Sequence, residues 1–265
     1  CQSAGCGGSA KERFEDNLKQ AAPAMFECEL SFTPDSDVSG PVYVYYELTN
    51  FYANHRRYVK SRSDNQLRGE DLTDDDKTYC KPQRFQGGDD EKEISPCGLV
   101  AWSMFNDTFS VASGADQIDE AGIAWESDLK HKFDGDAAVA NFNNVPQLRG
   151  GATISRMDDE HFVVWMRTAA LPKFRKLYGK IEGGLTKGQE VKFKVANNYN
   201  TYRFGGTKTL VLSNTSWLGG KNDFLGVCYL LVGCLSAAIA VGFTITHLRH
   251  PRVLGDVSRL SWNRS

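Results

Sequence analysis

The stretch Phe224-Leu-Gly-Val-Cys-Tyr-Leu-Leu-Val-Gly-Cys-Leu-Ser-Ala-Ala-Ile-Ala-Val-Gly-Phe-Thr-Ile-Thr-His-Leu248 contains no Lys, Arg, Asp or Glu. At about 1.5 Å per residue it would form a helix about 37 Å long, which crosses a hydrocarbon core of about 30 Å with some tilt. We therefore predict a transmembrane helix at residues 224–248. This helix divides the chain into a large domain, residues 1–223, and a short tail, residues 249–265.

The charges on either side of this helix predict its orientation. The segment before it carries only Lys221 and Asp223. The tail carries one aspartate and four arginines, namely Asp256, Arg249, Arg252, Arg259 and Arg264. Because basic residues beside a membrane helix favour the cytosolic side, we predict a cytosolic tail and an exoplasmic domain, lumenal or extracellular, at residues 1–223.

The cysteine content agrees with an exoplasmic domain, where disulfides persist. Five of the seven cysteines lie before the apolar stretch: Cys1, Cys6, Cys28, Cys80 and Cys97. Their number predicts two disulfides with one cysteine left over. A bridge between Cys80 and Cys97 would close a polar loop that has little apolar content, and would stabilise the domain by about 3 kcal/mol.

The same orientation makes two sequons candidate acceptors of N-linked glycans: Asn106-Asp-Thr108 and Asn214-Thr-Ser216. Asn106 lies in a polar segment and should be modified. Asn214 lies close to the membrane and is expected to be a poorer acceptor. Asn263, in the predicted cytosolic tail, should stay unmodified.

The domain before the helix has the composition of a folded unit. Aromatic residues make up 11% of the chain, too many for a disordered segment. Residues 1–223 hold 27 Lys and Arg against 32 Asp and Glu, a net charge of about −5 that argues against a nucleic-acid partner. No apolar signal region precedes Cys1, so we expect either a cleaved signal peptide or an amino-terminal membrane span upstream of this sequence.

Strand patterns are found in three places. Residues 41–46 read Pro-Val-Tyr-Val-Tyr-Tyr, and residues 191–196 alternate apolar side chains with lysines. Residues 197–204 and 207–212 flank Gly205-Gly206, a pair that tolerates the positive φ of a tight turn. We therefore predict a hairpin at this pair and an antiparallel meander near the carboxy-terminal end of the domain.

Helical patterns in the domain are few. Pro172 is suited to the first turn of a short helix, with Phe174 and Tyr178 on its apolar face. Residues 62–96 and 113–160 are long, polar and rich in Asp, Gly and Asn, and we interpret them as excursions from a β scaffold. The predicted fold class is mainly β: an antiparallel β-sandwich with short helices, attached to a transmembrane helix.

The sequence contains no recognisable catalytic motif. It lacks a nucleophile elbow, a phosphate-binding glycine loop and any paired metal-ligand spacing. Three histidines lie away from the apolar stretch, at His55, His131 and His161, and none has a second ligand at a zinc-site spacing. We therefore predict no catalytic residue, no metal site and no cofactor.

Two blocks concentrate basic and aromatic side chains. The first is Asn50-Phe-Tyr-Ala-Asn-His-Arg-Arg-Tyr-Val-Lys-Ser-Arg62, and the second runs from Val164 to Tyr178. Arginine in such a setting can stack on aromatic rings and bind a carboxylate or phosphate through two parallel hydrogen bonds. Taken alone, an internal network of salt bridges and cation–π contacts explains the first block better than a ligand site does, and core packing explains the second.

These blocks carry a resemblance to a known family. Residues 50–62 are followed, in order, by Pro96-Cys-Gly98, Ser103-Met-Phe-Asn-Asp-Thr108, Gly122-Ile-Ala-Trp125, Trp165-Met-Arg-Thr-Ala-Ala-Leu-Pro172 and Ser216-Trp-Leu-Gly-Gly-Lys-Asn222. Together they resemble the signature blocks of the cell-division-control-50/ligand-effect-modulator family over residues 28–248. Its members are non-catalytic β subunits of type IV P-type ATPases, which flip phospholipids. Residues 251–265 resemble the plant or green-algal branch.

The resemblance implies two membrane spans, cytosolic termini and a glycosylated exoplasmic domain between the spans. The first span would precede Cys1. The family's disulfides imply a bridge between Cys80 and Cys97 and a second from Cys28 to an upstream cysteine, for which Cys1 is favoured over Cys6.

The resemblance also implies a partner, the α subunit of a type IV P-type ATPase, in membranes from the endoplasmic reticulum to the Golgi, endosomes or plasma membrane. The chain would contact membrane lipids and help the ATPase to fold, leave the endoplasmic reticulum and work. We expect partner contacts from His55, Arg56, Arg57, Tyr58 and Arg167 and, in the membrane helix, from Gly233, Ala237, Ala238 and Gly242. The alternatives are a single-span cell-surface receptor or adhesion ectodomain and, third, a membrane-anchored hydrolase.

Overall fold

The computed structural model of the chain describes residues 26–85, 93–140, 154, 156–214, 223–251 and 255. The chain divides into two units, Cys1–Thr215 and Ser216–Ser265. The first unit contains the strands and short helices, and the second contains a long apolar helix.

Two antiparallel sheets form the first unit. One has the order β1-β5-β3 and consists of β1 (Phe26–Phe32), β5 (Val191–Asn197) and β3 (Thr108–Ser113). The other has the order β4-β2-β6 and consists of β4 (Phe174–Ile181), β2 (Val42–Leu48) and β6 (Lys208–Ser213). The strands predicted at residues 41–46 and 191–196 are confirmed, as is the antiparallel arrangement.

The alternation of side chains explains why these segments pair with one face buried. In β5, Val191, Phe193 and Val195 are buried, while Lys194 points to solvent. In β2, the alternate residues from Val42 to Leu48 are buried. Side chains of both sheets join a single hydrophobic cluster, and Phe109 of β3 meets Tyr178 of β4 edge to face at 4.8 Å.

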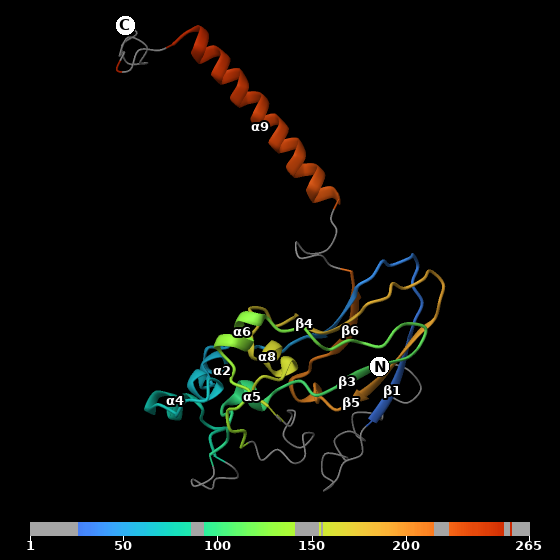
Figure 1. The fold of residues 1–265 in the computed structure, drawn as a ribbon, viewed down its shortest axis with the longest axis vertical. Coiled ribbons are helices and arrows are strands. Elements are labelled where there is room, and N and C mark those ends of the chain that lie inside the picture. The colour runs from blue at the N-terminus through green and yellow to red at the C-terminus, as the bar shows by residue number, and fades with distance from the viewer. Residues whose placement is uncertain are drawn as a thin grey trace. The chain divides into compact units, whose positions relative to one another are not determined.

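The segments that the sequence indicated as excursions contain three short helices among their described residues, and other short helices lie beside them in the sequence. Figure 1 shows them gathered at one end of the unit, beyond the strand ends. Thr73 begins one of them with a capping box, in which its side chain and that of Asp76 each accept from the other's backbone amide. The helical segments are α2 (Arg56–Lys60), α3 (Asp64–Leu67), α4 (Asp74–Tyr79), α5 (Leu99–Trp102), α6 (Glu126–His131), α8 (Glu160–Met166) and the 3₁₀ turn η1 (Tyr202–Phe204).

The predicted carboxy-terminal meander is wrong. Strand β6 pairs with β2, whereas β5 pairs with β1 and β3, so consecutive strands are not neighbours. The buried carboxylate of Asp107 accepts from the backbone amides of Asn198 and Tyr199, both at 2.6 Å, and holds the chain as it leaves β5. Gly205 then ends the 3₁₀ turn with φ +62°, so the glycine pair belongs to a crossover between sheets.

The helix predicted at Pro172 is also wrong. Residues Phe174–Ile181 form β4, which pairs with β2 from Leu48↔Phe174 to Val42↔Ile181. The apolar spacing that fits a helical face also fits a strand interrupted by a bulge, and the register does shift once within this pairing. Pairing with a buried strand therefore overrides the local helical pattern.

The Cys80–Cys97 disulfide joins the end of α4 to the residue before Gly98, and both cysteines are buried. The backbone amide of Cys97 donates to the Gln66 side chain at 2.9 Å, which ties the bridge to α3. Cys28 is disulfide-bonded as well. The two upstream candidates for its partner, Cys1 and Cys6, lie outside the described residues.

The second unit contains α9 (Asp223–Arg249). By length and composition α9 is able to cross a membrane, with a mean hydropathy of 2.4. Gly233 and Ala237, and likewise Ala238 and Gly242, are four residues apart, so each pair lies on one face of the helix.

The Cys80–Cys97 bridge yields a stability prediction. Replacing Cys97 by serine should lower the free energy of unfolding by about 3 kcal/mol, because the open chain gains loop entropy over the 17 residues of separation. Chemical denaturation of the purified protein under non-reducing conditions measures this. The matched control is Cys234→Ser, at a free cysteine of α9, which should leave the midpoint unchanged. Equal midpoints for the two variants would contradict the prediction.

Candidate interaction surface

The two basic-aromatic blocks of the sequence pack against each other around Phe51. Its ring lies edge-on to Tyr58 at 5.5 Å, Trp165 at 5.7 Å, Phe174 at 5.9 Å and Phe204 at 5.5 Å between centroids. Edge-to-face packing at these separations is the favourable arrangement of aromatic rings. We call these five rings the Phe51 cluster.

Polar contacts hold the connection between α8 and β4 beside this cluster. The Phe51 amide donates to the carbonyl of Pro172 at 3.1 Å, and the Asn54 side chain donates to the carbonyl of Ala170 at 2.8 Å. Asn50 adopts φ +57°, a left-handed conformation that asparagine tolerates, and its side chain donates to the carbonyl of Phe204. The first block thus fixes the backbone that follows α8.

Lys176 caps the carboxy-terminal end of α8. Its Nζ donates to the carbonyl of Val164 at 2.7 Å and to the carbonyl of Arg167. These carbonyls belong to the last turn of the helix, where the regular partner amides are missing. Burial, with a smaller contribution from the nearby Arg167 charge, lowers the pKa of Lys176 to about 8.

The segment held in this way, Arg167–Arg175, is here called the cationic loop. It reads Arg-Thr-Ala-Ala-Leu-Pro-Lys-Phe-Arg and contains no acidic residue. Leu171, near its middle, exposes 67% of its surface. A hollow beside it is lined by Asn50, Pro172 and Phe174.

Arg167 is anchored at one end of the loop by a buried carboxylate. Its Nε donates to Asp128, whose side chain is 2% exposed and also pairs with Lys132 at 2.7 Å. The hydrogen bond from Arg167 is the main cause that lowers the pKa of Asp128. The guanidinium lies 5.6 Å from the ring centre of Trp125, itself 67% exposed.

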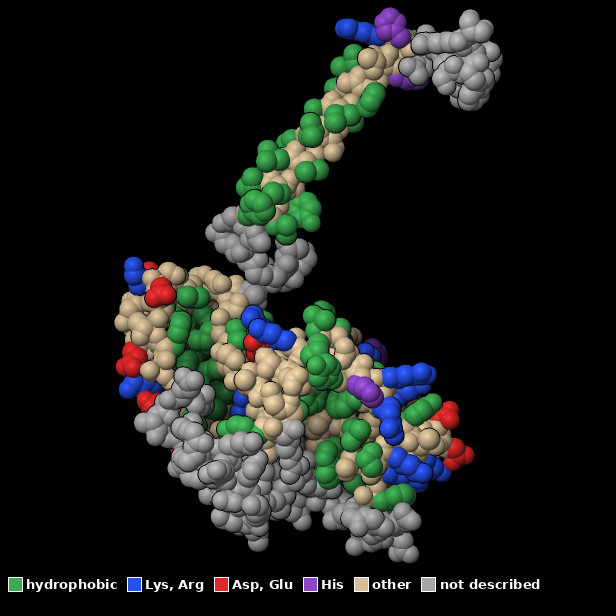
Figure 2. Space-filling model, turned by 180° about the vertical axis from the view of Figure 1, so that it is seen from behind, with side chains coloured by type: hydrophobic (Ala, Val, Ile, Leu, Met, Phe, Trp, Pro, Cys, Tyr) green, Lys and Arg blue, Asp and Glu red, His purple; other side chains and the backbone are tan. Residues whose placement is uncertain are grey.

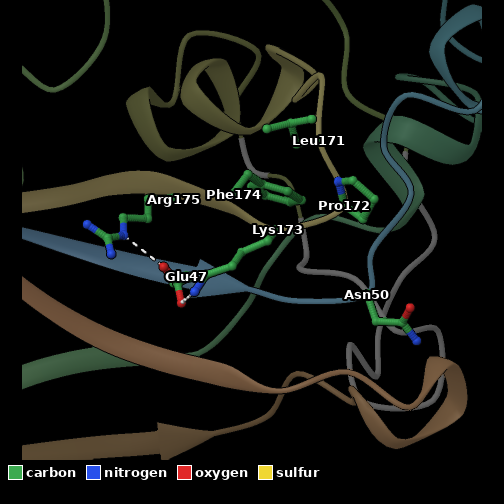
Figure 3. A pocket seen from close by; sticks show the side chains of 7 residues that line it. All are labelled: Glu47, Asn50, Leu171, Pro172, Lys173, Phe174 and Arg175. Atoms are coloured by element: carbon green, nitrogen blue, oxygen red, sulfur yellow. Dashed lines mark hydrogen bonds and ion pairs between the residues drawn. The ribbon is translucent and has the colours of Figure 1, made fainter.

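Arg175 is anchored at the other end of the loop in the same manner. Its Nε donates to Glu47 at 2.8 Å, and Lys173 approaches the same carboxylate at 3.3 Å. Glu47 belongs to β2 and its side chain is 9% exposed. Figure 3 shows both cations converging on Glu47, with the terminal nitrogens of Arg175 pointing away from it. The hydrogen bond from Arg175 is the main cause that lowers the pKa of Glu47.

The predicted contact residues of the first unit lie in two places: Tyr58 and Arg167 lie beside the Phe51 cluster, and His55, Arg56 and Arg57 lie at the start of α2. Tyr58 and Arg167 line the same crevice beside the Phe51 cluster, and Tyr58 also shares a hydrogen bond with Ser103 at 2.8 Å. His55 caps α2 by accepting from the Arg57 amide at 3.3 Å. The side chains of Arg56 and Arg57 are exposed and have no ion pair within the described part of the chain. One alternative predicted from the sequence was an internal network of salt bridges. Among the described residues, Arg56 and Arg57 do not take part in such a network.

Figure 2 shows Lys and Arg side chains gathered over the helical end of the first unit, with hydrophobic side chains exposed between them. Exposed cations of α2, including Arg56 and Arg57, belong to this end. Gly233, Ala237, Ala238 and Gly242 lie on α9 in the other unit.

Sequence reasoning missed four residues of this surface: Glu47, Asp128, Leu171 and Arg175. Two signals were available. Glu47 interrupts an apolar strand, which indicates a buried ion pair, and residues 167–175 carry three cations without an acid in a chain of net charge −2. The sequence does not indicate that Glu47 pairs with Arg175, because the two residues are 128 positions apart and only the tertiary fold brings them together.

The two glycan acceptors differ in accessibility. Asn214 is exposed at the end of β6. Asn106 is half-buried, and its Oδ1 is buried without a hydrogen-bond partner in the described residues. Its neighbour Asp107 is buried and pairs with Lys208. Modification of either asparagine stays a prediction.

Exposed arginines that are held by buried carboxylates are suited to binding another molecule. The comparison with known families makes the identification definite. The family model described as "LEM3 (ligand-effect modulator 3) family / CDC50 family" matches residues 4–253, and the chain belongs to this family. The resemblance seen in the sequence blocks is therefore confirmed.

Several curated proteins are similar to the chain. "ALA-interacting subunit 3" of Arabidopsis thaliana is 53% identical over 85% of this chain and 65% of its own length. "Cell cycle control protein 50A" of Bos taurus is 39% identical, over 81% and 66% respectively. "Phospholipid-transporting ATPase accessory subunit CRF1" of Saccharomyces cerevisiae is 37% identical, over 90% and 64%. The chain thus spans about two thirds of the length of these relatives.

The cap provided by Lys176 yields a prediction. Lys176→Met keeps the aliphatic stem but leaves two carbonyls without their donor, and should lower the free energy of unfolding by about 1–3 kcal/mol. The control is Lys180→Met in the same strand, which removes only surface ion pairs with Asp119 and Glu182 and should cost below about 1 kcal/mol. Chemical denaturation compares the two. Equal effects would show that Lys176 does not cap α8.

Proposed function

We propose that this chain is a non-catalytic β subunit of a type IV P-type ATPase, and that it supports the folding, export and phospholipid-translocating activity of the α subunit. The observation that carries this proposal is membership of the family, together with relatives named as ALA-interacting and phospholipid-transporting ATPase accessory subunits. None of the relatives described above is named as a receptor or a hydrolase, so those alternatives gain no support.

The proposed topology combines the sequence with the two structural units. Residues 1–223 form an exoplasmic domain in which the two sheets make a β-sandwich, residues 224–248 span the membrane, and residues 249–265 are cytosolic. The long apolar helix α9, the charges that flank it and the buried Cys80–Cys97 disulfide support this arrangement. We propose that Cys28 pairs with Cys1, and that glycans are attached on the exoplasmic side.

In this proposal the chain acts by binding and performs no step of ATP hydrolysis. The exposed cations of α2 and the cationic loop supply contacts on the exoplasmic side. The pairs Gly233/Ala237 and Ala238/Gly242 of α9 allow close approach of neighbouring membrane helices.

The role of α2 can be tested with the double variant Arg56→Ala/Arg57→Ala. Because both side chains are exposed and unpaired among the described residues, stability should change by less than about 0.5 kcal/mol. Retention of a co-expressed type IV ATPase α subunit during purification in mild detergent should fall several-fold. The control is Lys187→Ala/Lys194→Ala, which also removes two exposed cations.

Two results would count against these assignments. If the double variant retained the α subunit as well as the control does, α2 would not be part of the interface. If the unmodified chain did not retain the α subunit, and its removal from cells left phospholipid translocation unchanged, the proposed function itself would be wrong.

A further inference from the structure

We propose that the cationic loop, Arg167–Arg175, is a docking site for an acidic segment of the partner subunit. Two carboxylates of that segment contact Arg167 and Arg175, and an apolar side chain covers Leu171, which lies between the two arginines in the sequence. This inference rests on the proposed function, because it names the part of the chain that recognises the partner and the chemistry of the segment it recognises.

The first argument is the way in which the two arginines are held. Each donates through Nε to a nearly buried carboxylate, Arg167 to Asp128 and Arg175 to Glu47. Their terminal nitrogens have no hydrogen-bond partner among the described residues. Burying a carboxylate costs free energy, and an exposed arginine is stable in water without one. The two buried carboxylates are therefore not needed merely to keep the arginines in place on the surface. The arrangement instead fixes the direction of two planar donor groups, a geometry suited to bidentate binding of carboxylates. Figure 3 shows this for Arg175.

The second argument is charge. The loop carries Arg167, Lys173 and Arg175 and no acid, although the whole chain has a net charge of −2. Lys132 adds a fourth cation beside Asp128. The two anchoring carboxylates are 2% and 9% exposed, so a partner would meet mainly the cations. Complementary charge therefore predicts carboxylates on the surface that covers the loop.

The third argument is rigidity around an apolar centre. Leu171 is 67% exposed, while the carbonyls of its neighbours Ala170 and Pro172 accept from Asn54 and from the Phe51 amide. A loop already fixed in its bound conformation avoids the entropic cost of ordering on association. The exposed leucine and the two arginines together offer a partner apolar and charge-assisted contacts.

These features favour a protein segment over an anionic membrane surface. Binding to lipid headgroups depends on the number of nearby cations, typically clusters of about four to eight, and requires no fixed orientation. With Lys132 the loop presents four cations, the lower end of that range, and two of the four are oriented by buried carboxylates. A carboxylate-bearing polypeptide can use that fixed geometry, whereas a fluid headgroup layer cannot.

The test compares full-length variants co-expressed with a type IV ATPase α subunit and purified in mild detergent. Leu171→Asp should weaken retention of the α subunit at least tenfold, because it places a charge at the centre of the contact. Arg175→Lys keeps the charge and the pairing with Glu47 but loses the planar donor group, and should weaken retention several-fold. The controls are Phe32→Asp, at an exposed apolar residue of β1, and Arg156→Lys, at an exposed arginine paired with Asp158.

Each outcome decides one point. Loss in both loop variants with normal retention in both controls supports the inference, provided that all four keep the melting temperature of the unmodified chain. Retention of the α subunit by the unmodified chain and by both loop variants overturns the inference and leaves the proposed function intact. Binding of the same variants to phosphatidylserine-containing vesicles is measured in parallel. If the two loop variants keep the α subunit but lose vesicle binding, the inference is overturned in favour of a lipid surface. No retention by the unmodified chain overturns both.

Discussion

The edge-on packing of aromatic rings around Phe51 is the interaction on which the described surface depends. The ring follows β2 and meets Trp165 of α8, Phe174 of β4 and Phe204 of η1, which are far apart in sequence. The backbone amide of the same residue binds the carbonyl of Pro172. One residue therefore joins the edge of a sheet, the end of a helix and the turn between the sheets. The cationic loop lies where these elements meet.

Electrostatics then determine what the loop presents. Two carboxylates are buried beneath it, and each is paired through an arginine Nε. Removing an arginine would leave its buried carboxylate with a single lysine partner, Lys132 for Asp128 or Lys173 for Glu47, and should lower stability. The result is a fixed cationic surface on a chain whose net charge is negative. For a subunit that works by binding, a fixed surface lowers the entropic cost of each association.

The sequence predicted those features whose cause is local. The alternation in residues 191–196, the apolar strand at residues 41–46 and the uncharged helix near the carboxy terminus each depend on their own side chains, and the structure has β5, β2 and α9 there. The order of the strands depends on distant partners. Asp107 redirects the chain after β5, and β2 recruits residues 174–181 into a strand although their spacing also fits a helix.

In the candidate site, too, the sequence predicted the features with a local cause and missed those that depend on distant residues. Arginine-rich and aromatic blocks were visible in the sequence, and the prediction that Arg167 is important depended on them. The carboxylates that orient the cations were not identified, since Asp128 and Arg167 are 39 residues apart and Glu47 and Arg175 are 128 apart. A pairing over such separations is set by the tertiary fold and has no counterpart in local spacing.

The central claim is that the Phe51 cluster holds the cationic loop rigid. Amide hydrogen exchange in the full-length protein and in Phe51→Leu tests it most directly, because exchange reports local opening. In the unmodified protein, peptides covering residues 49–55 and 167–178 should exchange as slowly as the central strand β5. In the variant both should exchange faster together, while peptides of β5 keep their rate. Fast exchange of these peptides in the unmodified protein, or unchanged exchange in the variant, would contradict the account.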